Sequence, residues 1–253
     1  MEWYAYIAVV AIGVVAGIIN TLAGGGSLIT LPLLMALGLP PNVANGTNRI
    51  AIFLQNVVGV TSFHREKVMD FPGGFRVGIP AVAGSIAGAF IAVNMNDEVM
   101  KLAIGGIMIL MFFVILLKPN RWIRSHEAHP PIPYWLQVIV FFLVGIYGGF
   151  IQAGVGFFLI ASLVLGSGFE LVKANALKLF IILLYTPFAL LIFFLHRDVN
   201  LGMGLLLAAG TMTGAWIGTR IAVKWGAVFI RYFLLLAILI AASKLIYDAI
   251  RAL

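Results

Sequence analysis

Long apolar segments separated by short polar turns run through the whole chain. Ten can be read from the pattern: about 4–23, 26–38, 43–63, 74–94 and 99–117, then 134–152, 156–168, 172–195, 201–222 and 228–250. Most are close to the roughly 20 residues that a helix needs to cross a bilayer core. Because the bilayer offers no partners for unpaired backbone groups, we expect these segments to be helices. The pattern predicts an all-α, polytopic membrane protein.

Composition supports this class. The 253 residues are 62% hydrophobic and 10% charged, whereas soluble domains have about 45–50% and about 25%. The net charge of +7 comes mainly from Lys and Arg in short loops, where such residues set membrane topology, so we expect a lipid bilayer as partner and no nucleic acid. There is no cysteine, which excludes disulfides and thiolate metal sites.

The chain repeats itself at a shift of 130 residues. GSIAGAFIAV (84–93) then aligns with GAWIGTRIAV (214–223), and Ala44-Asn45 with Ala174-Asn175. We therefore predict two homologous repeats, 1–117 and 134–253, joined by the loop 118–133. Each repeat has about five segments, the second being short.

The short segments decide the topology. Thirteen residues (26–38) rise only about 20 Å as a helix, against a core of about 30 Å. If these segments are re-entrant, the repeats are parallel; if they cross, the repeats are inverted. The second arrangement divides Lys and Arg more unequally between the two sides, so the positive-inside rule favours inverted repeats.

Glycines break the helical pattern at equivalent places in the two halves. The sequence is GGG at 24–26 and GVG at 154–156. Glycine-interrupted short segments at corresponding positions of two repeats indicate the midplane site of a transporter. Helix N-termini after the breaks would present free N–H groups and a positive dipole end, which favour an anion.

Two cations lie inside otherwise apolar helical stretches. They are Arg49 in NGTNRIAIF and Lys178 in KANALKLFI, and the 130-residue shift places Lys178 on Asn48. A cation in the membrane is costly unless it is paired or faces a cavity. No acidic residue is near either in sequence, so a substrate anion is a reasonable partner, with arginine offering a bidentate fork.

Other interpretations of these residues stay open. Arg49 and Lys178 could instead extend to the membrane interface as topology anchors. Asn45 and Asn175 could cap helix starts. The glycine pairs 84/88 and 214/218 are better explained as packing faces than as site residues. The four histidines lie in loops or at segment ends, and we expect no metal site and no cofactor there.

The combined pattern resembles the TauE/SafE family of sulfite exporters. The resemblance rests on LAGGGSLITLPLLMALGLP followed by ANGTNR, and on GGFIQAGVGFFLIASLVLGSG followed by KANALK, and it covers nearly the whole chain. It implies transport of sulfite, thiosulfate or organosulfonates such as sulfoacetate across the bacterial inner membrane. The second half reads QAGVG where a run of glycines is common in the family, which makes Gln152 a candidate specificity residue. The implied substrate-binding residues are Gly24, Gly25, Gly26, Ser27, Asn45, Thr47, Asn48, Arg49, Gln152, Gly154, Gly156, Asn175 and Lys178.

The sequence thus favours a secondary transporter that moves small oxyanions by alternating access around a midplane site. An anion channel on the same scaffold is the alternative. An enzyme is not expected, because the apolar segments hold no cluster of His, Cys, Asp or Glu for intramembrane catalysis. There is no GxxxxGK[ST] phosphate loop, so nothing indicates ATP use. A homo-oligomer is possible, but no dimer face can be read.

Overall fold

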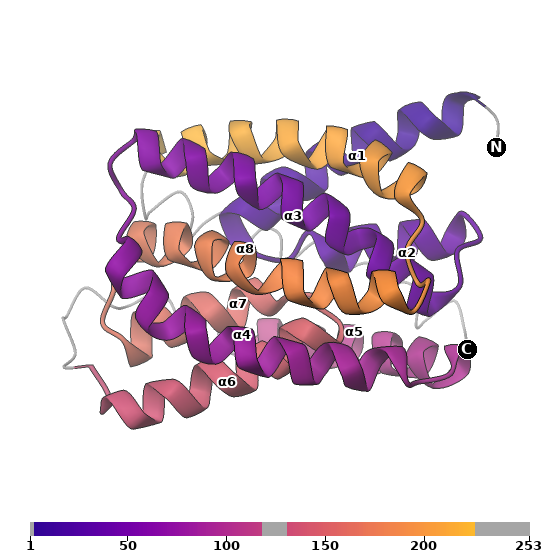
Figure 1. The fold of residues 1–253 in the computed structure, drawn as a ribbon. Coiled ribbons are helices and arrows are strands. Elements are labelled where there is room, and N and C mark those ends of the chain that lie inside the picture. The colour runs from indigo at the N-terminus through magenta and orange to yellow at the C-terminus, as the bar shows by residue number, and fades with distance from the viewer. Residues whose placement is uncertain (1–2, 118–130, 226–253) are drawn as a thin grey trace.

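The computed structural model describes residues 3–117 and 131–225, and all its regular elements there are helices (Figure 1). Most of the loop 118–133 and the predicted segment 228–250 lie outside the described residues. The elements are α1 (Trp3–Ala23), α2 (Ser27–Ala36), α3 (Pro41–Arg65), α4 (Phe71–Val93), α5 (Asp97–Leu117), α6 (Tyr134–Phe150), α7 (Val155–Ala161), η1 (Ser162–Gly166), a π-helical turn, and α8 (Leu171–Leu195). A further helix spans Leu201–Trp225.

The helices confirm the segments expected from the hydrophobic pattern, and turn residues set many of their ends. Pro40 precedes α3, whose first residue is also proline, as expected for a residue with fixed φ and no N–H. The Asp70 carboxylate accepts from Gly73 N at 3.0 Å and caps α4. Four described helices, including α4, α8 and Leu201–Trp225, are long and apolar enough to cross a membrane. The protein is therefore an all-helical membrane protein.

The element bounds recur at the 130-residue shift. α3 (Pro41–Arg65) falls on α8 (Leu171–Leu195), and α2 overlaps α7 and η1. The duplication and the inverted orientation of the repeats both stay predictions.

Both short helices begin after a left-handed glycine. Gly24 has φ 83° and Gly154 has φ 73°, a region that glycine reaches without steric cost. Gly38 and Gly168 have φ of 90° and 74° after the short helices, where such glycines end helices. Gln152, with φ 50°, takes this conformation without being glycine.

Glycine faces join each half to the other. A Cβ at Gly84 or Gly88 of α4 would overlap carbonyl oxygens of α6. A Cβ at Gly214 would likewise overlap the Val14 carbonyl oxygen of α1, and one at Gly218 would lie 3.0 Å from Thr21 Cβ. These close approaches confirm that the two glycine pairs are packing faces. The fourth helix of each predicted half thus packs on the first helix of the other.

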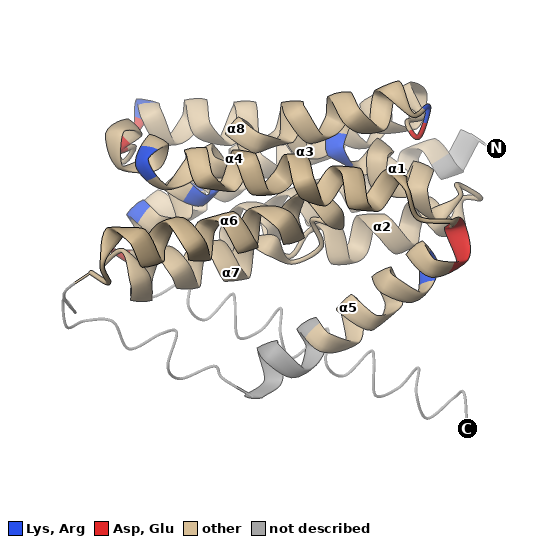
Figure 2. Cartoon of the chain, turned by 60° about the horizontal axis from the view of Figure 1, so that its bottom comes forward, with Lys and Arg blue, Asp and Glu red and all other residues tan. Residues whose placement is uncertain are grey.

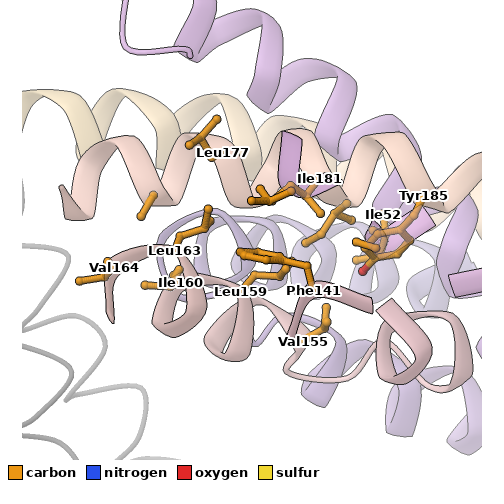
Figure 3. Close-up of a cluster of buried hydrophobic side chains, with 14 residues drawn as sticks. Ile52, Phe141, Val155, Leu159, Ile160, Leu163, Val164, Leu177, Ile181 and Tyr185 are labelled. Carbon is orange, nitrogen blue, oxygen red and sulfur yellow. The ribbon is translucent and has the colours of Figure 1, made fainter. Parts of the chain in front are cut away.

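The view of Figure 1 shows how the helices lie relative to α8. In Figure 1, α3, α1 and the helix Leu201–Trp225 lie on one side of α8, with α4, α6 and α7 on the other. Side chains from α3, α6, α7 and α8 meet in a buried apolar cluster that includes Ile52, Phe141, Leu159 and Ile181 (Figure 3). Figure 2 shows that charged residues gather mainly at the two ends of the helices, which leaves an apolar band between them.

Candidate functional site

The two glycine breaks touch each other. A Cβ on Gly24 would overlap the Cα of Gly156, and a Cβ on Gly156 would overlap the Cα of Gly24. Beside them, a Cβ on Gly25 would lie 2.9 Å from the Phe157 ring. The absence of side chains therefore lets the backbones of the two halves cross at this point.

The Arg49 guanidinium is held by the last turn of α6. Nη1 donates to Gly148 O at 3.2 Å, and Nη2 donates to Gly149 O at 2.5 Å and to Phe150 O at 3.3 Å. The guanidinium also lies 4.5 Å from the centre of the Phe193 ring. Arg49 is fully buried, and its Nε–H has no partner. The guanidinium thus donates to backbone carbonyls in the last turn of α6, which lack partners within the helix and form the negative end of its dipole.

The Lys178 ammonium is held in the equivalent way by the end of α1. Nζ donates to Asn20 O and Thr21 O, both at 2.9 Å, and to Asn175 Oδ1 at 2.7 Å. An ammonium has three donors, so all of them are used. Lys178 is fully buried.

The two cations therefore bond across the predicted halves. Arg49 belongs to the first half and binds α6 of the second, whereas Lys178 belongs to the second half and binds α1 of the first. Phe150 and Asn20, which each supply one acceptor, are equivalent at the 130-residue shift. Burial rules out the interpretation that either cation reaches the membrane interface as an anchor. No carboxylate forms a hydrogen bond with either cation within residues 3–117 and 131–225.

The equivalent asparagines are not helix caps. Asn45 and Asn175 lie within the second turns of α3 and α8, whose N-cap residues are Pro40 and Glu170, so the capping interpretation is wrong. Asn45 Nδ2 donates to Phe150 O at 2.7 Å, which leaves Oδ1 without a partner. Asn175 is turned the other way, since its Oδ1 faces Lys178 and its Nδ2 is unpaired.

Three of the predicted polar residues are occupied by structural hydrogen bonds. Asn48 Nδ2 donates to Ser27 Oγ at 3.1 Å, and Thr30 Oγ1 donates to Asn48 Oδ1 at 2.7 Å. The Asn48 amide therefore joins α2 to α3. Thr47 Oγ1 accepts from Asn200 N at 2.8 Å, which ties α3 to the loop before the helix Leu201–Trp225.

The start of α2 carries free backbone donors. Within the described part of the chain, the N–H groups of Gly25, Gly26 and Ser27 donate to no other group. Ser27 is also the residue that meets Asn48, next to Arg49. The free N–H groups that the glycine pattern predicted are thus present at the start of α2, and such groups at a helix N-terminus suit an anion.

Gln152 joins the Arg49 region to α8. Its Nε2 lies 3.5 Å from the Tyr185 hydroxyl oxygen and 3.4 Å from Thr186 Oγ1, and its Oε1 is unpaired. The Tyr185 hydroxyl is also close to the backbone of Gly148, the residue that accepts from Arg49 Nη1.

Four residues near the cations were missing from the predicted set. Tyr185, Thr186, Asn20 and Thr21 are buried, and Asn20 Nδ2 and Thr21 Oγ1 have no partner. Polar residues inside apolar segments are the signal that could have identified all four.

Comparisons with known proteins agree with this architecture. The sequence profile of the family described as "Sulfite exporter TauE/SafE" matches residues 9–245. The chain is 28% identical to a "Probable membrane transporter protein ORF9" of Sinorhizobium sp., over 92% of this chain and 89% of that protein. It is 29% identical to the "Probable membrane transporter protein YfcA" of Escherichia coli K12, over 94% and 88%. It is 25% identical to the "Probable membrane transporter protein YunE" of Bacillus subtilis, over 97% and 98%.

No solved structure matches the chain. The family match spans both glycine breaks and both buried cations, and the relatives align over nearly their whole lengths. The chain therefore belongs to the sulfite exporter TauE/SafE family and is a membrane transporter.

Proposed function

We propose that this transporter is a secondary carrier for small oxyanions, with sulfite, thiosulfate and organosulfonates such as sulfoacetate as its substrate class. It acts in the bacterial inner membrane, by alternating access around a site at the two glycine breaks. The family's name and the chemistry of the breaks both support this substrate class.

The observation that carries the proposal is a pair of buried cations with no carboxylate partner among the described residues. Arg49 and Lys178 are both fully buried. Backbone carbonyls supply only partial negative charge, so a net positive charge remains at this place. An anion that enters the site would be attracted by both cations.

The donors divide between side chains and backbone. Arg49 Nε–H and Asn175 Nδ2 are unpaired donors, and the start of α2 adds backbone N–H groups. Lys178 has no free donor in this conformation, so it contributes its charge and the orientation of Asn175. We assign Asn48, Ser27 and Thr47 the role of holding α2 and α3 in position.

The reciprocal bonds suggest how the site would open to either side. Arg49 ties α3 to α6, and Lys178 ties α8 to α1. A movement of α3 against α6 or of α8 against α1 has to break these hydrogen bonds and replace them with others. An anion that takes over a donor from Arg49 would lower the barrier to that exchange, which couples substrate binding to movement.

Uptake into proteoliposomes tests the proposal. Purified protein would be given radiolabelled sulfite, thiosulfate and sulfoacetate, alongside Arg49→Ala and Lys178→Ala. Exposed residues on nearby helices supply matched controls, Arg76→Ala on α4 and Lys173→Ala on α8. We expect the two buried substitutions to abolish uptake and the two controls to preserve it.

Counterflow separates a carrier from a channel. A carrier accelerates uptake when unlabelled anion is preloaded inside the vesicles, whereas a channel gives conductive flux without that stimulation. If no tested anion moves under any imposed gradient, the proposed substrate class is wrong. If uptake survives both buried substitutions, the cations have only a structural role.

A further inference from the structure

Two buried side chains converge on one carbonyl oxygen at the end of α6. Asn45 Nδ2 lies 2.7 Å from Phe150 O, and Arg49 Nη2 lies 3.3 Å from the same atom. The remaining polar atoms of the two side chains, Asn45 Oδ1 and Arg49 Nε, are buried without partners. Each belongs to the same amide or guanidinium group as the nitrogen that contacts the shared oxygen.

The same turn of α6 connects Arg49 to Tyr185 and Gln152. Arg49 Nη1 donates to Gly148 O at 3.2 Å, and a Cβ on Gly148 would lie 2.8 Å from the Tyr185 hydroxyl oxygen. That oxygen in turn accepts from Gln152 Nε2. Asn45, Arg49, Gln152 and Tyr185 therefore form one group around the end of α6, which we call the Arg49 cluster.

The two amides of this cluster present oxygen atoms. Asn45 must turn its nitrogen toward Phe150 O, because a carbonyl accepts only a donor, so Oδ1 is left free. Thr186 donates its one hydroxyl proton to Ile182 O at 2.6 Å and can therefore only accept from Gln152. Gln152 must turn Nε2 toward it, so Oε1 is left free.

The other two members present donors. Arg49 Nε–H has no acceptor, and in the described part of the chain the Tyr185 hydroxyl accepts from Gln152 without an acceptor for its own proton. The Arg49 cluster thus offers two unpaired donors, one of them cationic, and two unpaired acceptors. A buried polar atom without a partner is costly, so the matching ligand supplies both acceptors and a donor.

A fully deprotonated oxyanion offers only acceptors and would leave both amide oxygens unpaired. We propose that the Arg49 cluster binds sulfite in its singly protonated form, as hydrogen sulfite. The ligand O–H donates to Gln152 Oε1, and the anionic oxygens accept from Arg49 Nε and the Tyr185 hydroxyl. This inference rests on the proposed function and adds that a proton crosses the membrane together with sulfite.

The protein groups around the cluster do not provide an alternative carrier for that proton. The titratable side chains that face it are Arg49 on α3, Tyr185 on α8 and Tyr147 on α6, whose hydroxyl donates to Ala153 O. No Asp, Glu or His among the described residues hydrogen-bonds to any of them. The backbone of Gln152 also supports a binding role for this residue. Its positive φ of 50° is a strained conformation for a residue other than glycine, and such strain is common at functional sites.

Calorimetry on the purified full chain tests the inference. Sulfite binding would be titrated in two buffers of different ionisation enthalpy, at a pH where the sulfite dianion predominates in solution. We expect about one proton to be taken up for each sulfite bound. Methanesulfonate, a permanent monoanion with no proton to share, serves as the control ligand and is expected to bind without proton uptake.

Gln152→Met keeps the length of the side chain and removes both the Oε1 acceptor and the Nε2 contacts to Tyr185 and Thr186. Loss of the Nε2 contacts affects both anions, whereas loss of Oε1 affects sulfite alone, so we expect sulfite binding to weaken about tenfold more than methanesulfonate binding. Gln137→Met is the matched control, since Gln137 is buried near the other end of α6, where it bonds to Ile132 O and Ser167 Oγ. It is expected to change neither affinity.

The outcomes separate this inference from the proposed function. Binding of both anions without proton uptake would overturn the inference alone, as would an equal loss of both affinities in Gln152→Met. Failure of wild type to bind either anion would overturn the proposed function and the inference with it. The number of protons that the wild-type protein takes up per sulfite bound tests the inference even if Gln152→Met does not fold.

Discussion

Gly24 and Gly156, in different halves of the chain, meet at their Cα atoms where the two broken helices cross. Neither position has room for a methyl group, because the neighbouring atom is backbone and cannot turn aside. The contact therefore fixes how closely α1 and α2 approach α7, and with it the distance between the helix ends that hold Arg49 and Lys178.

A series of glycine substitutions separates crowding from backbone strain. Gly38→Ala introduces strain alone, since Gly38 has φ 90° with open space around it, and we expect a cost of about 1–2 kcal/mol. Gly156→Ala introduces crowding alone, and Gly24→Ala introduces both. Thermal unfolding of the purified proteins should rank Gly24→Ala as the least stable. Equal stability of Gly38→Ala and Gly24→Ala would show that the crossing tolerates a methyl group.

Asp198, in the loop between α8 and the last described helix, should make the free energy of unfolding depend on pH. Partial burial, and then the nearby Asp97 carboxylate, raise the pKa of Asp198 above its ordinary value of 3.8, against attraction by His196. The folded protein then binds this proton more tightly than the unfolded chain does, so stability falls as pH rises through the raised pKa. Asp198→Asn should flatten this part of the stability profile, measured by thermal unfolding from about pH 4 to 7.

Asp97→Asn supplies the control for that measurement. It removes the neighbouring charge and should lower the pKa of Asp198, which weakens the pH dependence without abolishing it. An unchanged profile in Asp198→Asn would assign the pH dependence to another group.

Lys178 and Asn175 should behave as one unit. Lys178→Met leaves the Thr21 carbonyl without its donor and leaves Asn20 O with Gly24 N alone. We expect the free energy of unfolding to fall by about 3 kcal/mol, since hydrogen bonds to charged groups contribute about 1.5–3 kcal/mol each. Asn175→Leu removes one of the three acceptors and should cost less. The double variant should cost less than the sum, as measured by a double-mutant cycle on unfolding. Additive losses would mean that the 2.7 Å contact contributes nothing.

The helices were predictable from sequence because their signals are local. The apolar run predicted at 172–195 is α8 (Leu171–Leu195), and the short run at 26–38 contains α2 (Ser27–Ala36). The polar breaks were located by their glycines, because the left-handed backbone at Gly24 and Gly154 favours that residue type.

The partners of the cations were not predictable. Every residue carries a backbone carbonyl, so nothing in the sequence marks Gly148, Gly149 and Phe150 as the acceptors for Arg49, about 100 residues earlier. The same holds for Asn20 and Thr21 beside Lys178. The sequence showed that the two charges need partners. Which partners they have follows from the way the first helix of each half packs against the other half.

Arg49→Lys distinguishes a structural cation from one that binds substrate. An ammonium at this place can still donate to the end of α6, so we expect the fold to survive with a loss of about 1–3 kcal/mol. Its three donors would be taken by the three carbonyls at the end of α6, just as all three donors of Lys178 are taken, and the unpaired Nε–H would be gone. The lysine would thus keep its hydrogen bonds to α6 but lose the donor to the anion. Sulfite uptake should therefore fall at least about tenfold, which corresponds to about 1.4 kcal/mol or more of interaction free energy with the anion. Uptake equal to wild type in a folded Arg49→Lys protein would mean that Arg49 only completes the end of α6, and the anion would then have to be held by the backbone donors at the start of α2.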